Sequence, residues 1–401
     1  MASRELDRRG LAALASGHAA ADLCQGAVPA LIPFLISQRG YSFGAAGALL
    51  LVVTIGSSVI QPIFGAVSDR LALSWLMPAG VLMAAIGVAG AGVTTSFGMT
   101  ALAVGIGGIG IAAFHPEGAR YANYASGNRR GTGMSLFSVG GNAGFAMAPV
   151  LITPAVLSFG LSGTAVVAIL PLAAAIMLAI ELPHLKARTA RAADKAATRA
   201  RANDRSEDDW GAFTRLSGLI SVRAGIYYGL QTFAPVWLIH EYGLSEAGGN
   251  TALAAMLIAG ACGTLVGGRI VDRVGRRSVL IGSTLAQVPL LIGFMLAPGG
   301  LLAGLLMAAI GFVTVMSFSV SVVMGQEYLP SRLGIASGVT LGLAIGMGGV
   351  AAAILGPIAD NAGLETVMWA IALLPLASLA LALTLPLTSH ERHTAARTAT
   401  A

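Results

Sequence analysis

Charged residues are scarce in this chain, and their scarcity excludes most soluble folds. Only 10% of the 401 residues are Asp, Glu, Lys or Arg, while 56% are hydrophobic and the mean hydropathy is +0.79. Soluble domains carry roughly 25% charged residues, and no ordinary core needs so many apolar side chains. The composition therefore predicts an integral membrane protein in which most apolar side chains face lipid.

A cysteine framework and a cleavable signal are missing as well. Cys24 and Cys262 both lie inside apolar stretches, where a thiol packs as a small side chain, so we expect neither a disulfide nor a metal pair. The charged start, with Arg4, Arg8 and Arg9, leads straight into the first apolar stretch. We therefore expect no cleavable secretory signal.

Twelve apolar stretches follow one another, each long enough to cross about 30 Å of hydrocarbon as a helix. They cover residues 11–38, 43–68, 75–94, 97–123, 131–157, 162–182, 216–240, 246–271, 278–297, 299–325, 333–359 and 365–386. We predict an all-α integral membrane fold of two six-helix bundles, residues 1–182 and 216–401. The polar residues 183–215 between them are rich in Ala, Arg and Lys, which suits either a surface helix or a flexible linker.

Basic residues gather on one side of these predicted spans. When the chain is threaded in and out, 20 of the 24 Lys and Arg residues fall on the side of the termini and the polar stretch, and only Arg39 falls in an opposite loop. Lys and Arg favour the cytoplasmic side. We therefore predict a bacterial inner-membrane protein whose termini and linker are cytoplasmic. The net charge of +6 is then a topology signal and not a sign of nucleic-acid binding.

A short motif of glycine, aspartate and arginine occurs twice, each time at the end of an apolar stretch. Its members are Gly65, Asp69 and Arg70 in the first copy and Gly268, Asp272, Arg273, Arg276 and Arg277 in the second. The two aspartates are 203 positions apart, about half of the chain, which predicts a transporter built from two related bundles. Within each copy the glycine and the aspartate share a helix face. The aspartate can accept from backbone amides and pair with the arginines.

We expect the two copies to form a cytoplasmic gate that stays shut while the outside is open. The first copy lacks the basic tail of the second, so its contribution is expected to be weaker. Glu327 is assigned to the same gate, through a pair with Arg332 or with the Asp272 cluster. It lies 210 positions after Glu117, roughly the repeat distance. The alternative is that these charges are solvated loop residues.

Glycines at four-residue intervals mark two spans that occupy matching places in the two halves. They are Gly140 and Gly144 in the first half and Gly338, Gly342 and Gly346 in the second. Small residues on one helix face let neighbouring backbones approach closely. Close packing is the simpler interpretation, and a hinge that slides during transport is the alternative.

Ionisable residues inside apolar spans are costly and indicate function. His18, Asp22 and Gln25 in the first span are spaced by four and three residues, so they share a face that we expect to point into the bundle. Asp22 is predicted to take up and release a proton as the hydration of a central cavity changes, and His18 and Gln25 are assigned to substrate contact. A static hydrogen bond of Asp22 to a neighbouring helix is the alternative, and His18 could instead lie at the interface.

The fourth span carries His115, Pro116, Glu117 and Arg120. Proline permits a kink, and Glu117 and Arg120, three positions apart, can pair. An ideal helix would point His115 elsewhere, although a kink could relax that. We assign His115 and Glu117 to proton coupling and Arg120 to substrate contact, with a static ion pair as the alternative. Metal binding is not predicted, because no second His or Cys stands at ligand spacing on this helix.

The second half carries fewer charges within its spans. Arg223 lies about two turns into the seventh span, followed by Tyr227, Tyr228 and Gln231 at helical spacing. A cation with aromatic and amide neighbours could hold an anionic substrate group. Arg223 could instead extend its guanidinium to the cytoplasmic interface.

These motifs together resemble a known family. The repeated glycine–aspartate–arginine motif is similar to the loop motif of the major facilitator superfamily. The chain also resembles the fosmidomycin-resistance group of that superfamily. The motifs that carry this resemblance are Gly17-His18 with Asp22, Gln61-Pro62, Phe114-His115-Pro116-Glu117 and Gly140-Gly141-Asn142-Ala143-Gly144. The resemblance implies two six-helix bundles with pseudo-two-fold symmetry and efflux that exchanges drug for protons. It also places Asn142 among the expected substrate contacts.

We expect a proton-coupled exporter of small drug-like or anionic compounds, a class that includes phosphonate antibiotics such as fosmidomycin. Its expected partners are the substrate, protons and the bilayer; we predict a monomer without a cofactor. An uptake symporter for a small metabolite remains the main alternative, because proton-coupling residues serve both directions. A membrane-embedded enzyme would need a nucleophile with a base, or several metal ligands. A receptor that does not transport would leave the buried charges without a purpose.

Overall fold

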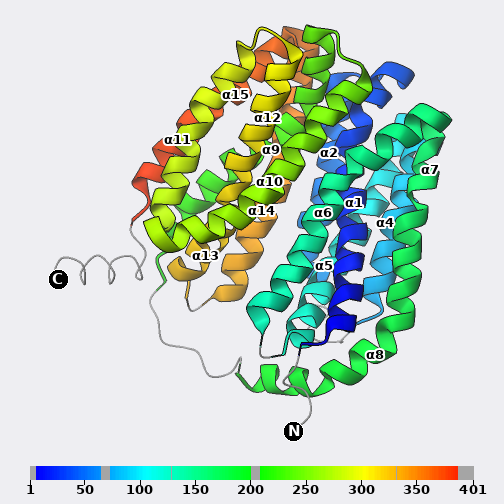
Figure 1. Cartoon of the computed structure of the whole chain (residues 1–401), viewed down its shortest axis with the longest axis vertical. Coiled ribbons are helices and arrows are strands. Elements are labelled where there is room, and N and C mark those ends of the chain that lie inside the picture. The colour runs from blue at the N-terminus through cyan, green and yellow to red at the C-terminus, as the bar shows by residue number, and fades with distance from the viewer. Residues whose placement is uncertain (1–5, 65–72, 128, 200–207, 331, 387–401) are drawn as a thin grey trace, which may run out of the picture. The chain divides into compact units, whose positions relative to one another are not determined.

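The computed structural model describes residues 6–64, 73–127, 129–199, 208–330 and 332–386, and all of its regular structure there is helical (Figure 1). The chain divides into two compact units, Met1–Asn203 and Asp204–Ala401. The first contains α1 Arg8–Arg39, α2 Phe43–Ser58, α4 Leu76–Val93, α5 Phe97–Ala125, α6 Arg130–Phe159, α7 Gly163–Val167 and α8 Ile169–Arg199. The second contains α9 Trp210–Tyr242, α10 Glu246–Val274, α11 Arg276–Met295, α12 Gly300–Met316, α13 Phe318–Tyr328, α14 Leu333–Ala362 and α15 Leu364–Thr384.

The predicted all-α membrane fold is confirmed, but the count of twelve separate spans is not. Ten stretches of the described residues are long and apolar enough to cross a membrane. The expected fifth and sixth spans merge into one stretch, Thr132–Ala187, because only a 3₁₀ turn, Gly160–Ser162, and the short helix α7 separate α6 from α8. The expected seventh span lies in α9, which is absent from the ten stretches. Its arginines, tyrosines and glutamine lower the mean hydropathy of this helix.

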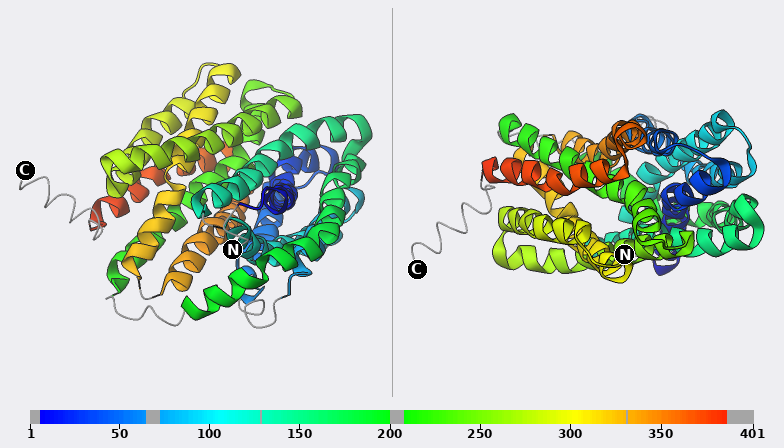
Figure 2. Two further views of the ribbon diagram at one scale, coloured as in Figure 1. Left: turned by 60° about the horizontal axis from the view of Figure 1, so that its bottom comes forward. Right: turned by 90° about the horizontal axis from the view of Figure 1, so that it is seen from above.

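The first helix of each unit lies at the centre of that unit. α1 packs against α4, α5, α6 and α8, and α9 packs against α10, α12, α14 and α15 (Figure 2). The most apolar window of α1 is 83% buried, whereas no other candidate span exceeds 56%. Gln25 is buried and His18 and Asp22 are half-buried, which places the predicted first-span site in the interior of the unit.

Helix ends recur at an interval of 203 residues. Gly40 ends α1 with φ +64° and Gly243 ends α9 with the same φ, a left-handed conformation that favours glycine. Ser42 then caps α2 through Ala45 N–H, and Ser245 caps α10 through Gly248 N–H. The duplication is thus visible in backbone geometry as well as in the charged motif.

Long-range backbone contacts repeat in the same way. The N–H of Asp7, before α1, donates to the carbonyl of Ala125 at the end of α5 over 2.9 Å. The N–H of Asp209, before α9, donates to the carbonyl of Tyr328 at the end of α13 over 2.7 Å. In each unit the start of the central helix is therefore fixed to the end of its fourth span.

Glycines let α6 approach α1 more closely than any side chain would permit. A Cβ on Gly140 would meet the backbone of Ala15, and one on Gly144 would meet the carbonyl of Ala19. The close-packing interpretation describes these two positions well. It does not extend to Gly338 in α14, where a Cβ would meet nothing within 4 Å.

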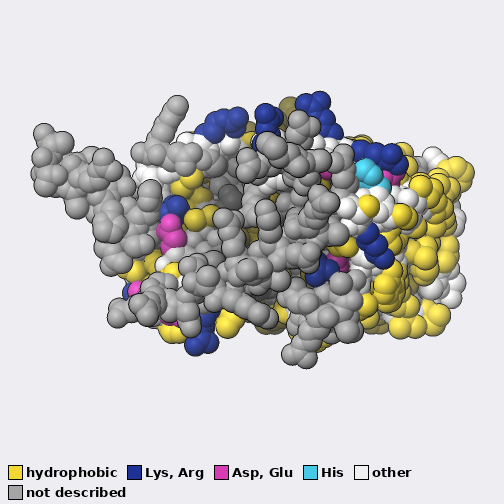
Figure 3. Space-filling view, turned by 90° about the horizontal axis from the view of Figure 1, so that it is seen from below, with side chains coloured by type: hydrophobic (Ala, Val, Ile, Leu, Met, Phe, Trp, Pro, Cys, Tyr) yellow, Lys and Arg dark blue, Asp and Glu magenta, His cyan; other side chains and the backbone are white. Residues whose placement is uncertain are grey.

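The predicted linker begins as a helix. α8 runs without a break through Pro183 to Arg199, so the first half of residues 183–215 has the helical conformation. Arg9 pairs with Glu181 at 2.7 Å, and His184 lies 3.1 Å from Asp7. Both contacts fix α8 to the start of α1. Figure 3 shows Lys and Arg side chains on this end of the molecule, next to a flank covered by hydrophobic side chains.

Candidate functional site

Asp22 lies between two histidines that come from different helices. His18, one turn earlier on α1, places Nε2 3.3 Å from Asp22 Oδ2, and His115 on α5 places Nε2 3.1 Å from Asp22 Oδ1. The three side chains are 12–19% exposed, so they are partly shielded without being sealed from water. The structure therefore joins His18, Asp22 and His115 into one cluster, which we call the His–Asp–His cluster.

Backbone carbonyls orient both imidazoles of this cluster. His18 Nδ1 lies 2.8 Å from the carbonyl oxygen of Phe137, and His115 Nδ1 lies 2.8 Å from that of Ile111. A carbonyl only accepts, so each Nδ1 must carry a hydrogen. Each Nε2 then lies at ion-pair distance from the Asp22 carboxylate, although the contact of His115 does not have hydrogen-bond geometry at Asp22 Oδ1, and a proton on Nε2 would lie between nitrogen and oxygen. The two contacts together accommodate two protons.

Aromatic packing holds His18 in place. Its ring stacks on Phe137 of α6, with centroids 4.1 Å apart and planes 22° apart, and lies edge-on to His115 at 5.1 Å. A protonated imidazole is favoured over an aromatic face. Phe137 thus supports the cluster through both its ring and its carbonyl, a role that no sequence motif indicates.

Gly141 lies directly against the cluster. A Cβ built there would be 2.5 Å from both Asp22 Oδ2 and His18 Nε2. Real contacts of this kind are not that short, so any larger residue must displace the cluster. The Gly-Gly pair beside Asn142 was the available sequence signal, but sequence spacing alone could not show which residue lies opposite it.

We expect Gly141→Ala to uncouple proton movement while the protein still folds. Overpacking by one methyl costs about 1–3 kcal/mol, and the side chains that must move are those of His18 and Asp22, of which Asp22 is a predicted proton-coupling group. The rate of gradient-driven transport should fall severalfold, which is more than the loss of thermal stability in detergent would explain. Gly98→Ala is the matched control, because a Cβ there meets nothing within 4 Å. Equal behaviour of the two variants would show that Gly141 does not position the cluster.

Glu117 and Arg120 form a second charged group, separate from the histidines. Arg120 Nη2 lies 2.5 Å from Glu117 Oε1 and 2.7 Å from Oε2, and the Glu117 side chain is fully buried. The i,i+3 pairing expected from the sequence is present. The sequence grouped His115 with Glu117 for coupling, whereas the structure places His115 against Asp22.

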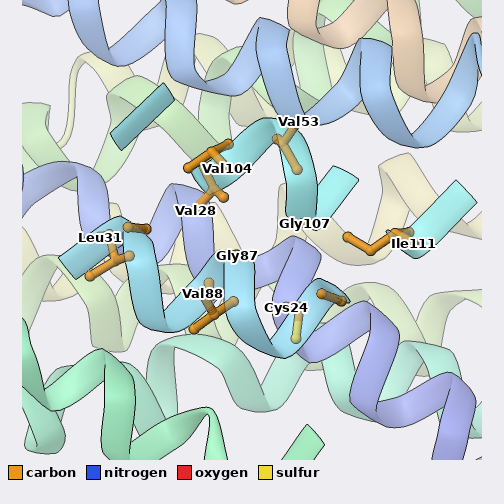
Figure 4. A pocket seen from close by; sticks show the side chains of 12 residues that line it. Cys24, Val28, Leu31, Val53, Gly87, Val88, Val104, Gly107 and Ile111 are labelled. Carbon is orange, nitrogen blue, oxygen red and sulfur yellow. The ribbon is translucent and has the colours of Figure 1, made fainter. Parts of the chain in front are cut away.

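The other predicted substrate contacts in the first unit lie near the cluster. Gln25 is buried on α1, three residues beyond Asp22, and Asn142 is partly exposed on α6 beside Gly141. A small pocket between α1, α2, α4 and α5 is lined by apolar residues and glycines, among them Cys24, Val28 and Ile111 (Figure 4). None of its lining residues is charged, so it supplies packing space and no recognition of charge.

The second unit places its predicted contacts along α9. Arg223 is 7% exposed and Gln231 is fully buried. The ring of Tyr228 packs over Gly348 of α14, and Tyr227, partly exposed, meets it edge-on at 5.6 Å. Arg223 donates into the bundle, to Thr284 of α11, to the carbonyl of Thr314 in α12, and to Ser317 between α12 and α13. Its guanidinium therefore does not extend to the interface, which removes that alternative.

The prediction of no metal used an incomplete argument. It considered α5 alone, where His115 has no second ligand, and did not include His18 from α1. The ligand-type atoms of His18, Asp22 and His115 lie within 4.8 Å of one another. The Nδ1–carbonyl contacts direct both Nε2 atoms toward Asp22, an orientation that suits a shared proton and a metal ligand alike; the absence of a metal stays a prediction.

Comparisons with known proteins identify the family. The model of the Major Facilitator Superfamily matches residues 14–344. The chain belongs to the major facilitator superfamily. It is 32% identical to the "Fosmidomycin resistance protein" of Escherichia coli (strain K12) over 368 residues, 91% of this chain and 90% of that protein. It is 33% identical to the "Uncharacterized MFS-type transporter YfnC" of Bacillus subtilis (strain 168), over 89% of this chain and 88% of that one.

Solved structures agree with this membership at the level of the fold. A bacterial homologue of the human lysosomal transporter Spinster has a TM-score of 0.73 at 16% identity, covering 93% of this chain and 95% of that one. The nucleoside transporter NupG has a TM-score of 0.67 at 17% identity, covering 93% and 98%. As a member of this superfamily, the chain is a multi-pass membrane transporter and not an enzyme.

Part of the predicted superfamily gate can be placed. Gly65, Asp69 and Arg70 lie outside the described residues. Gly268, Asp272 and Arg273 are described only as part of the α10 backbone. Within the described part, Arg276 pairs with Glu327 at 2.7 Å, which links the second motif to α13. Arg332 pairs with Asp208 instead, at 3.3 Å. Arg332 and the second motif are the two partners predicted for Glu327, and the described ion pair is with Arg276 of the second motif.

One described contact of Arg277 lies at the end of α15. It donates to the carbonyl of Leu383 over 2.9 Å, and Arg215 donates to the carbonyl of Thr384 over 2.8 Å. These are the last carbonyls of α15, which a helix leaves unpaired and which cations stabilise. The described contact of Arg277 is therefore a helix cap, and its part in the gate stays a prediction.

Proposed function

We propose that this protein is a proton-coupled secondary transporter that exports small drug-like or anionic compounds by alternating access. Superfamily membership and the relative named a fosmidomycin resistance protein support export and make phosphonate antibiotics the first substrates to test. The distribution of Lys and Arg supports an inner-membrane orientation with both termini in the cytoplasm. The observation that carries the coupling step is the His–Asp–His cluster.

The cluster couples protons to movement because its contacts depend on its proton content. With two protons, each Nε2···Asp22 contact has a hydrogen between nitrogen and oxygen. Loss of one proton leaves one contact with facing lone pairs, which repel. His18 and Asp22 share α1, so that contact is local. The contact of His115 joins α5 to α1, and its loss favours a rearrangement of these helices.

Two states that differ in hydration would then differ in proton affinity. A cluster open to the acidic outside would load its second proton. The same cluster facing the cytoplasm would release that proton, in a step coupled to substrate binding or substrate release. Rocking of the two bundles supplies the change of access. An uptake symporter would use the same cluster, and the sign of the coupled proton movement distinguishes the two.

The test uses proteoliposomes with a trapped pH dye and an acidic interior. Addition of fosmidomycin outside should raise the internal pH, because an antiporter exchanges entering substrate for leaving protons. EDTA is present throughout, so that no trace metal titrates the histidines, and protein-free liposomes give the leak. Further acidification of the interior would establish symport. Substrate flux without proton movement would contradict coupling, and no flux for any compound of a broad panel would contradict transport.

A further inference from the structure

A buried cation in the second unit has only neutral partners. Arg223 Nη1 donates to Thr284 Oγ1 over 2.8 Å, and its Nη2 donates to the carbonyl of Thr314 over 2.8 Å and to Ser317 Oγ over 2.5 Å. The residue is 7% exposed. α9, α11 and α12 thus surround a guanidinium that stays protonated at any physiological pH.

Arg223 differs from Arg120 in having no carboxylate partner among the described residues. Arg120 faces a buried carboxylate at 2.5 Å, whereas none of the ion pairs formed by described residues includes Arg223. A buried charge that is hydrogen-bonded but unpaired is costly. Three neutral acceptors orient the guanidinium without neutralising it, which leaves a positive centre inside an apolar helix bundle.

We infer that Arg223 is the binding group for an anionic substrate, one that carries a carboxylate or a phosphonate or phosphate on a small apolar body. This inference rests on the proposed transport function and names its substrate class. A planar guanidinium with five donors matches both oxyanions. Thr284 and Ser317 hold part of the fork in place, so the remaining donors are already oriented when the anion arrives.

Neighbouring amides provide a second, independent sign of a ligand. Gln287 donates to Thr314 Oγ1 over 2.6 Å, but its fully buried Oε1 has no hydrogen-bond partner. Gln231, two turns beyond Arg223 on α9, is fully buried with both amide atoms unpartnered. Buried polar atoms are almost always satisfied. These amides are therefore available for further polar groups of the same ligand.

The experiment measures ligand protection against thermal unfolding of the purified protein in detergent, with no pH gradient. The probes are phenylphosphonate, phenylphosphate and benzoate, compared with neutral benzamide and cationic benzylamine. We expect at least one oxyanion to bind about tenfold more tightly than benzamide, a preference that one charge-assisted contact can supply. The carboxylate and phosphorus probes, taken separately, decide which oxyanion is preferred.

Arg223→Gln should remove the preference for the oxyanion, and Arg223→Lys should retain part of it. Arg269→Gln is the matched control, because Arg269 is exposed and donates to Leu265 of its own helix. Ser317→Ala, which keeps the cation and loosens its orientation, tests the site if Arg223→Gln does not fold. Equal protection by oxyanion and benzamide in the wild type, or an unchanged preference in Arg223→Gln, would show that Arg223 only cross-links the helices. Because no gradient is involved, either result is independent of whether the His–Asp–His cluster couples protons.

Discussion

Replacement of Asp22 by asparagine is expected to abolish proton-driven transport while substrate binding persists. Asparagine has the shape of aspartate, so its carbonyl can accept from one Nε2 and its amide can donate to the other. Both contacts of the cluster, 3.3 and 3.1 Å in the wild type, can then persist at a single proton content. If the proton content of the cluster does not change during the transport cycle, a proton gradient cannot drive that cycle.

The size of the effect follows from the gradient itself. One pH unit stores about 1.4 kcal/mol per proton, which sustains about tenfold accumulation for one-proton exchange. In Asp22→Asn this ratio should fall to about one. Counterflow, which needs no gradient, should stay within a factor of about three because no substrate contact is lost.

Asp360→Asn serves as the matched control, because Asp360 is exposed on α14 in the other unit. It should behave as the wild type in both assays. Accumulation that still follows the pH gradient in Asp22→Asn would remove Asp22 from the coupling step. Loss of counterflow as well would indicate a structural role instead.

The parts of the site that lie on one helix could be predicted from the sequence. His18 and Asp22 are one turn apart, and Glu117 and Arg120 are three residues apart, so helix geometry alone brings each pair together. The contact between Asp22 and His115 could not be predicted, because it depends on how α1 and α5 are aligned. That alignment is set by packing, to which glycines such as Gly141 contribute.

The fold was accessible because membrane insertion depends on simple properties of the chain. Hydropathy places the helices, and the repeated aspartate motif gives the interval of 203 residues that the helix caps confirm. The offset of 210 residues between Glu117 and Glu327 only approximates this interval, so the two glutamates are not equivalent positions. At the interval of the caps, Glu117 corresponds to Val320 and Glu327 to Tyr124. The charges of the two units are thus unlike, although their backbones repeat.

Removal of the Glu117 carboxylate alone is expected to destabilise the protein strongly. Its side chain is fully buried and holds Arg120 through two short contacts, 2.5 and 2.7 Å. Removing one partner of a fully buried pair costs about 3–5 kcal/mol, and we expect a cost toward the lower end of this range because the Arg120 side chain is 21% exposed. Glu117→Leu should therefore lower the thermal midpoint in detergent well beyond an exposed control such as Glu365→Leu, which lies in the first turn of α15.

The double variant Glu117→Leu with Arg120→Met separates structure from function. Replacement of both partners by apolar residues is often neutral or stabilising by about 1–4 kcal/mol, so the thermal midpoint should recover. If Glu117 takes part in coupling, the recovered protein should still lack gradient-driven accumulation, because no titratable group remains at that position. If the double variant transports as the wild type does, the pair is a static ion pair, and coupling lies with the His–Asp–His cluster alone. Counterflow without a gradient completes the test, because its loss would indicate that the substrate contact predicted for Arg120 is missing, whereas its persistence would assign the defect to coupling.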